Sequence, residues 1–255
     1  MHHLRHSLTA LVLLAAFLLT FAACGGGGGG GSAPVTALKT STIRTFNPGD
    51  SWSFTVSGNM NLANGARYDL SGTGSETVLS SKVTDPLNAT ECLDLFTTMT
   101  FTVAGETITD SSHNYGVQDA KGSLLIYGGS TDTAIQWVTT PPGYYEMLAS
   151  PVIKGQSGGK TVDFDDGSQL TYSYTVRNTT ENVSTDIGTF ECYVIDLSET
   201  INNVDGSQIV SYGTDYFVPG LGYVRGTGTA SYYLNSVFQF SLTLTRVLHS
   251  TNVVY

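Results

Sequence analysis

The stretch "TVDFDDGSQLTYSYTV", residues 161–176, decides the fold class of this chain. Its Asp166-Gly167 pair separates two short segments in which apolar and polar residues alternate. One face of the second segment carries only apolar and aromatic side chains, namely Leu170, Tyr172, Tyr174 and Val176. A period of two is the pattern of a β-strand with one buried and one solvent-facing side. The stretch therefore predicts an antiparallel hairpin, with a type I′ turn in which both central residues have positive φ.

The same pattern recurs along the chain. Asn64-Gly65 lies in "NMNLANGARYDLSG" and Asp205-Gly206 in "INNVDGSQIVSYG". The closing "SVFQFSLTLTRVL" alternates with Phe238, Phe240, Leu242 and Leu244 on one side. Gly, Ser, Thr, Tyr and Val dominate the composition, which favours strands over long helices. We expect a mostly β protein built from antiparallel curled sheets or an incomplete barrel. The only helix candidates are short, near residues 88–98 and 143–150.

Two similar segments predict a tandem repeat of about 100 residues. "LNATECLDLFTTMT" (87–100) and "IGTFECYVIDLSET" (187–200) both place Glu-Cys after a turn-like stretch and before mixed apolar and acidic residues. The break Pro141-Pro142-Gly143 would then separate a first β repeat, 40–140, from a second, 141–255.

Cys92 and Cys192 occupy matching positions in these two segments. An even pair of cysteines in an oxidising compartment is compatible with a disulfide. If the repeat is real, however, each copy contains one unpaired cysteine. Such a cysteine would then act as a small apolar residue buried inside a strand. Both interpretations, the disulfide and the two buried thiols, stay open at this point.

The amino terminus predicts export and a lipid anchor. In "LVLLAAFLLTFAACGGGGGGGSAPV" (11–35) the apolar run ends at Ala23, too early for the roughly 20 apolar residues of a membrane-spanning helix. A basic start, a short apolar middle and small residues at the end are typical of a secretory signal. "FAAC" resembles a bacterial lipobox, with Phe21 where leucine is usual. The resemblance implies a lipoprotein signal peptide, 1–23, and acylation of Cys24. The alternatives are ordinary cleavage that leaves a free Cys24 thiol, and a retained transmembrane anchor.

The glycines after Cys24 predict a flexible tether, residues 24–39. Nine or ten such residues have a mean end-to-end distance of about 15–18 Å, enough to hold a folded domain just clear of a membrane. One acyl chain anchors only marginally, whereas the triacylated cysteine implied by the lipoprotein resemblance anchors firmly. Gly25, where inner-membrane lipoproteins carry aspartate, indicates the outer membrane of a bacterial cell envelope.

The stretch "YFVPGLGYVRGTGT" (216–229) resembles uncharacterised bacterial periplasmic and lipoprotein domains. These are similar in build to the LolA/LolB lipoprotein carriers, in which an antiparallel sheet curls into an incomplete barrel. The resemblance covers the second half best and implies no catalytic residue. From the residues alone, Pro219 with its neighbouring glycines predicts a tight turn that places Val218 and Val224 on adjacent strands.

Composition and motifs argue against several functions. The net charge of −10 disfavours nucleic acid and anionic head groups as partners. Only His113 and His249 follow the signal, so a multi-histidine zinc site is not expected. Asp163 and Asp165 match the first positions of a calcium loop, but Tyr174 stands where that loop needs Glu, so we interpret 163–168 as an exposed hairpin tip. No catalytic residue, metal or cofactor is predicted.

The predicted function is that of a non-catalytic, membrane-anchored envelope lipoprotein. One-faced apolar strands in a curled sheet leave a lined cavity if no helix fills it, so we expect an apolar ligand or a lipidated client there. The alternative is a surface or structural interaction module, adhesive or glycan-binding, that uses exposed Tyr and Thr side chains.

Overall fold

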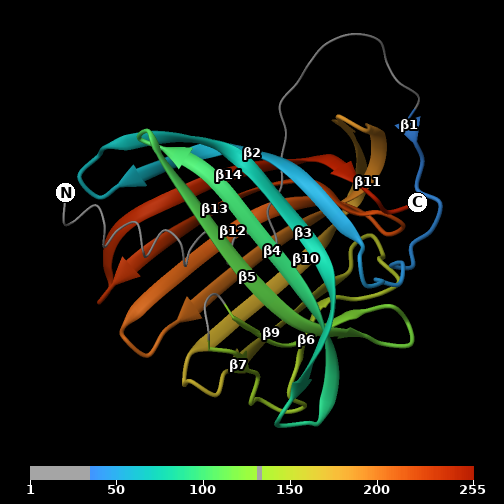
Figure 1. Ribbon diagram of the computed structural model, residues 1–255, viewed down its shortest axis with the longest axis horizontal. Coiled ribbons are helices and arrows are strands. Elements are labelled where there is room, and N and C mark those ends of the chain that lie inside the picture. The colour runs from blue at the N-terminus through green and yellow to red at the C-terminus, as the bar shows by residue number, and fades with distance from the viewer. Residues whose placement is uncertain (1–34, 131–133) are drawn as a thin grey trace.

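A computed structural model describes residues 35–130 and 134–255 (Figure 1). Cys24, the predicted signal and most of the predicted tether lie outside these residues. The strands are β1 (Val35–Thr36), β2 (Ser51–Leu62), β3 (Arg67–Asp85), β4 (Thr90–Val103), β5 (Glu106–Gln118), β6 (Leu124–Ser130), β7 (Gln136–Trp137), β8 (Tyr145–Leu148), β9 (Ser157–Asp163), β10 (Gln169–Thr185), β11 (Gly188–Asn202), β12 (Ser207–Val218), β13 (Gly222–Leu234) and β14 (Val237–Thr251). Within the described ranges there is no helix long and apolar enough to cross a membrane.

The strands form one 14-stranded sheet, and the predicted curled antiparallel architecture is confirmed. The order is β7-β6-β5-β4-β3-β2-β14-β13-β12-β11-β10-β9, with β1 added parallel to β11 and β8 added to β6. Two meanders, β2 to β7 and β9 to β14, are therefore joined side by side where β14 pairs with β2. In Figure 1, β3, β4 and β5 cross in front of β12 and β13, so the two halves of the sheet face each other.

Glycines on the concave side allow this curl. Gly58 pairs with Leu70 and Leu244, two residues of the main core, and a Cβ at Gly58 would overlap the main-chain carbonyl of Thr243. Gly72 pairs with Phe101 in the same way, and its Cβ would lie 2.6 Å from the Phe101 Cα. Strand glycines mark sites of close backbone approach, and here they let neighbouring strands bend over one another.

The two edges of the sheet meet at the predicted hairpin tip. Val138, just after β7, forms an isolated antiparallel bridge with Phe164, just after β9. The Asp165 amide donates to the Trp137 carbonyl at 3.0 Å, and Asp165 Oδ1 accepts from the Trp137 amide at 2.9 Å. The tip is exposed, as predicted, and its carboxylate and main-chain groups also bond to the opposite edge. These bonds are few, so the sheet is curled but not closed into a barrel.

The predicted hairpins are confirmed in place, but the type I′ prediction for their turns is wrong. Only the glycines of the three pairs have positive φ: Gly65 at 85°, Gly167 at 88° and Gly206 at 81°. Each glycine amide donates a hydrogen bond to the carbonyl three residues earlier. This pattern is characteristic of a three-residue hairpin loop with a glycine bulge. Two-residue loops with positive φ at both positions occur instead at Ala104-Gly105 and Asn235-Ser236.

The helix candidates near 88–98 and 143–150 are also wrong. Residues 90–103 form β4, and Tyr145–Leu148 form β8. In β4 buried and less buried residues alternate from Met99 to Val103, because one side of the strand faces the core. Short segments without strong periodicity follow the sheet around them rather than their own propensity.

The apolar core divides into three clusters. The largest fills the concave side, and a second, around Trp52, Phe190 and Leu248, closes the end of the sheet where β2 begins. Val218 and Val224 both belong to this second cluster, and β12 ends at Val218 while β13 begins at Gly222, so the predicted tight turn is confirmed. The third cluster consists of Cys92, Tyr115 and Trp137 with their partly buried neighbours.

The hairpins β3–β4 and β10–β11 share a local irregularity. The register shifts between Val78 and Lys82 in the first pair and between Val176 and Thr180 in the second. In both hairpins the cysteine of the second strand lies just past the shift. The duplication stays a prediction, and these matching bulges are the structural feature that it would explain.

Candidate functional site

Four charged side chains from β3, β11, β12 and β14 are among those on the concave side of the sheet, close to the main core. They are Glu76 on β3, Glu199 on β11, Asp215 on β12 and Arg246 on β14. Relative exposure is 0% for Asp215, 2% for Arg246 and 3% for Glu199. Burying an ionised group is costly unless it is paired and hydrogen-bonded. Such a cluster is therefore the feature of this interior that most needs an explanation.

The sheet register brings Asp215 and Arg246 into one row. Asp215 pairs with Gly226 on β13, and Gly226 pairs with Arg246 on β14. Because side chains in one row of a sheet lie on the same face, both groups point to the concave side. Gly226 has no side chain, so nothing from β13 stands between them.

Arg246 is held by one carboxylate and two aromatic rings. Its Nη1 donates to Glu76 Oε1, and its guanidinium carbon lies 4.3 Å from the Phe54 ring centroid and 5.8 Å from that of Tyr223. Stacking of a desolvated cation on aromatic rings is favourable. Among the described residues, however, Arg246 Nε and Nη2 have no hydrogen-bond partner.

Asp215 is the unpaired member of the cluster. Neither of its oxygens has a hydrogen-bond partner in the described part of the chain. Burial raises the pKa of this carboxyl well above its usual range, and the charge of Arg246 opposes only part of that effect. Glu76, Asp215 and Arg246 together carry one excess negative charge when both acids are ionised, so the interior favours a neutral Asp215.

Glu199 is a second buried acid on the same face. Burial raises its pKa from 4.5 to about 8, and the hydrogen bond from Ser211 Oγ, at 3.2 Å, opposes the shift. It lies opposite Tyr172 of the core, so its surroundings are mainly apolar and aromatic. At neutral pH this side chain is mostly a neutral acid.

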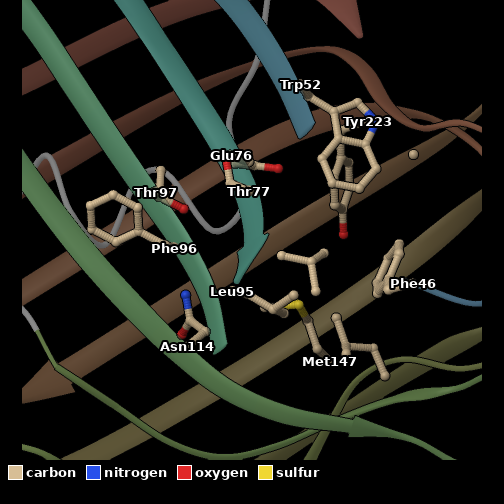
Figure 2. Close-up of a pocket in the computed structure, with 13 residues that line it drawn as sticks. Phe46, Trp52, Glu76, Thr77, Leu95, Phe96, Thr97, Asn114, Met147 and Tyr223 are labelled. Carbon is tan, nitrogen blue, oxygen red and sulfur yellow. The ribbon is translucent and has the colours of Figure 1, made fainter. Parts of the chain in front are cut away.

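A cavity of about 60 Å³ adjoins the cluster (Figure 2). Its wall is formed by Phe46, Trp52, Glu76, Thr77, Val78, Leu95, Phe96, Thr97, Asn114, Leu124, Met147, Gly222 and Tyr223. Figure 2 shows the Glu76 carboxylate, Trp52 and Tyr223 directed toward the same space, whereas Phe96 points away from them. Glu76 is the one charged residue among these thirteen. The cavity therefore has apolar and aromatic walls with a single anionic group.

The cavity is small for a ligand pocket. Ligand pockets usually measure about 300–1,000 Å³, whereas this cavity measures about 60 Å³. The curled sheet fills most of its concave side with its own side chains, among them Phe101, Tyr145, Tyr172 and Tyr174. Binding of an apolar ligand in this cavity stays a prediction.

The cavity lies at the end of the sheet where the chain enters. Trp52 and Tyr223 stand near the first residues of β2 and β13, and the sheet order makes β2, β11 and β13 run in the same direction. Val35, the first described residue, pairs with Thr189 at the start of β11. The cavity is thus at the same end of the molecule as the predicted tether.

The other residues singled out from the sequence lie elsewhere. Cys24 is outside the described residues. His113 Nδ1 lies 2.8 Å from Asp94 Oδ1, and His249 Nδ1 lies 2.7 Å from Asp186 Oδ2. No group of three or more His, Cys, Asp or Glu residues that could hold a metal ion occurs in the described part of the chain.

Cys92 and Cys192 are free thiols, so the disulfide alternative is wrong and the buried-thiol alternative describes them. They lie in different core clusters, on β4 and β11, and five strands separate these two in the sheet. Both are completely buried. Desolvation raises the pKa of Cys92 to about 11 and that of Cys192 to about 12.

We expect both thiols to resist modification in the native protein. A Cys24→Ala chain incubated with an aromatic disulfide reagent near neutral pH should release less than about 0.1 equivalent of thiolate before unfolding, because only the thiolate reacts. In denaturant two equivalents should be released at once. Rapid labelling of the native protein, or no labelling after unfolding, would contradict this assignment.

Sequence reasoning missed the charged cluster, although a signal was present. In "LTLTRVL" (242–248), Arg246 continues the face of Leu242 and Leu244, and in "VIDLSETI" (194–201), Glu199 stands between Leu197 and Ile201 on one face. A lone charge on the apolar face of an alternating strand predicts a buried ionisable group. No comparable signal indicated that these groups meet across the sheet.

No protein-family model and no curated protein matches the chain. Two solved structures are similar to it. One, from Bacteroides fragilis, is a "putative exported protein with YmcC-like fold"; it is 15% identical, with 83% of this chain and 99% of that chain covered and a TM-score of 0.33. The other, a "putative lipoprotein" from Parabacteroides distasonis, is 14% identical, with 81% and 98% covered and a TM-score of 0.33.

Proposed function

We propose that this protein is a non-catalytic envelope lipoprotein, anchored through Cys24, that binds a small apolar group in the cavity at the tethered end of its sheet. The observation that carries the proposal is the position of the cavity. Trp52, Val78, Leu95 and Met147 form an apolar wall at the same end as Val35, a residue of the predicted tether. A site at that end is held close to the membrane, where apolar molecules are concentrated.

The anchor is tested by comparing the wild type with Cys24→Ala. The wild type should fractionate with membranes and yield an acylated amino-terminal peptide, because two or more acyl chains anchor stably. The variant should be released in soluble form. Wild-type material that keeps residues 1–23, or carries an unmodified thiol, would contradict the anchor.

Ligand binding is tested by native mass spectrometry of the soluble Cys24→Ala chain. We expect a co-purifying molecule whose occupancy falls when Leu95→Phe fills the cavity. Leu93→Phe, on the same strand but outside the cavity wall, is the matched control. Equal occupancy in the two variants, or bare protein throughout, would contradict the site.

A second candidate is the interaction module, and exposed turn tips favour it. Val204 is 70% exposed, Val237 61% and Leu234 39%, and all three lie at the end of the sheet opposite the tether. The Asn235 amide donates to the Gly206 carbonyl at 3.1 Å, which joins two of these turns. Apolar groups presented away from the membrane suit contact with another envelope component.

The second candidate is tested with Val204→Ser/Val237→Ser. The double variant should keep its melting temperature, because both side chains are exposed, and should lose binding to isolated envelope material. Leu87→Ser, an exposed position in the turn between β3 and β4, is the control. Unchanged binding in the double variant would remove this candidate.

A further inference from the structure

We propose that the cavity beside Glu76 takes a primary alkylammonium group on a short apolar stem. The inference rests on the proposed function and deepens it by naming the chemistry of the ligand. It depends on four properties of the site: the charge of its wall, the charge of the cluster behind it, the aromatic rings around it and its size.

The wall of the cavity offers an anion and no cation. Glu76 is the one charged residue in the lining, and 22% of its side chain is exposed. Its Oε1 accepts from Arg246, which leaves Oε2 for a donor in the cavity. An ammonium group supplies such a donor with a positive charge, and charge-assisted hydrogen bonds of this kind are the stronger ones.

The cluster behind the wall has no excess positive charge that would repel a cation. Glu76 and Asp215 face a single guanidinium, that of Arg246, and Asp215 has no hydrogen-bond partner among the described residues. With Asp215 neutral, Glu76 and Arg246 balance each other, and a cation bound beside Glu76 is balanced in turn when Asp215 releases its proton. No buried group offers a matching balance for an anionic ligand.

The rings around the cavity also favour a cation. Phe46 and Trp52 meet edge to face with their centroids 6.0 Å apart, and Tyr223 lines the same space. Trp52 Nε1 is already bonded to the Leu221 carbonyl at 2.8 Å, so its ring is held in place. Aromatic faces near a carboxylate form a usual environment for alkylammonium groups.

Arg246 is a poor site for an anionic ligand, although two of its nitrogens lack partners. It does not line the cavity, and its guanidinium is covered by the rings of Phe54 and Tyr223. An anion would have to displace Glu76 to contact it. The volume of about 60 Å³ favours a small ammonium group on a narrow stem over a bulky head group, unless the wall moves.

The experiment compares three four-carbon probes: butylammonium, 1-butanol and butyrate. Trp52 and Trp137 are the two tryptophans of the chain, so the full chain with Trp137→Phe, in a non-ionic detergent, reports on the cavity through Trp52 fluorescence. Butylammonium should bind at least tenfold more tightly than butanol, and butyrate should bind weakest. Glu76→Gln should weaken butylammonium at least tenfold and leave butanol unchanged, and Glu91→Gln, an exposed acid on β4, should change neither.

The outcomes separate the two proposals. If butanol binds as tightly as butylammonium, or butyrate binds best, the alkylammonium inference is overturned while the apolar site stands. If no probe changes the Trp52 signal, both proposals fall. The comparison of probes on the parent chain decides the matter even if Glu76→Gln does not fold.

Discussion

Raising the pH from about 5 to about 9 is expected to lower the free energy of unfolding by roughly 4 kcal/mol through the titration of Glu199. Burial raises the pKa of this side chain from 4.5 in the unfolded chain to about 8 in the native protein. The native state thus binds the proton more tightly than the unfolded state does. Its contribution is complete below the unfolded pKa and is lost as the pH rises through the native one.

Between about pH 5 and pH 9, the other acids with shifted pKa values either leave the free energy of unfolding largely unchanged or lower it further. Burial raises the pKa of Asp215 as well, so its contribution has the same sign. Three acids have lowered pKa values because hydrogen bonds favour their charged forms, and their contributions change only at lower pH: Asp163, Asp196 and Asp205.

The measurement is urea unfolding of the parent chain and of Glu199→Gln at several pH values. The variant should lose the Glu199 share of the pH dependence and become the more stable protein near pH 9, because glutamine keeps the shape without the charge. Glu91→Gln, at an exposed acid, should retain the full dependence. Identical slopes for Glu199→Gln and the parent would show that Glu199 titrates normally.

Gly72→Ala is expected to destabilise the protein by at least about 3 kcal/mol or to prevent folding. A Cβ at Gly72 would overlap the main-chain carbonyl of Thr100 and lie 2.6 Å from the Phe101 Cα and 2.9 Å from its Cβ. Main-chain atoms of a central strand cannot move aside without breaking the ladder between β3 and β4. The methyl group of an alanine at position 72 would therefore prevent the close approach of β3 and β4 that the curled sheet requires.

The matched control is Gly220→Ala, in the turn between β12 and β13. No atom lies within 4 Å of a Cβ at that position, and the residue does not have a positive φ. We expect a change within about 0.5 kcal/mol. Equal melting temperatures for the two variants would mean that the sheet can relax around residue 72 and that the glycines do not set its curl.

The strands were predictable wherever alternation was long and the turn chemistry clear, as in 169–176 and 237–248. The turn type was not, because Asn-Gly and Asp-Gly suit both a type I′ turn and a three-residue loop with a glycine bulge. Only the register of the paired strands selects one of them. Residues 90–103 were misjudged in part because their own pattern is weak and the neighbouring strands decide their conformation.

The candidate site was less predictable than the fold. The positions of Arg246 and Glu199 on apolar strand faces indicate buried charges. Their contact partners could not be predicted, because they are up to 170 residues away along the chain. Cys92 and Cys192 show the same limit. Their spacing left pairing open, and the sheet order separates them.

The amino-acid sequence by itself determined the antiparallel hairpins, because alternation and glycine-containing turns act between residues that are near neighbours in the chain. Only the tertiary structure decided that the two meanders form one curled sheet, that its interior is nearly full, and that Glu76, Asp215 and Arg246 share one buried space. These features depend on strand register and on contacts between distant segments. Such contacts become favourable only after the chain has closed long loops. Local sequence patterns therefore do not specify which distant strands will pair.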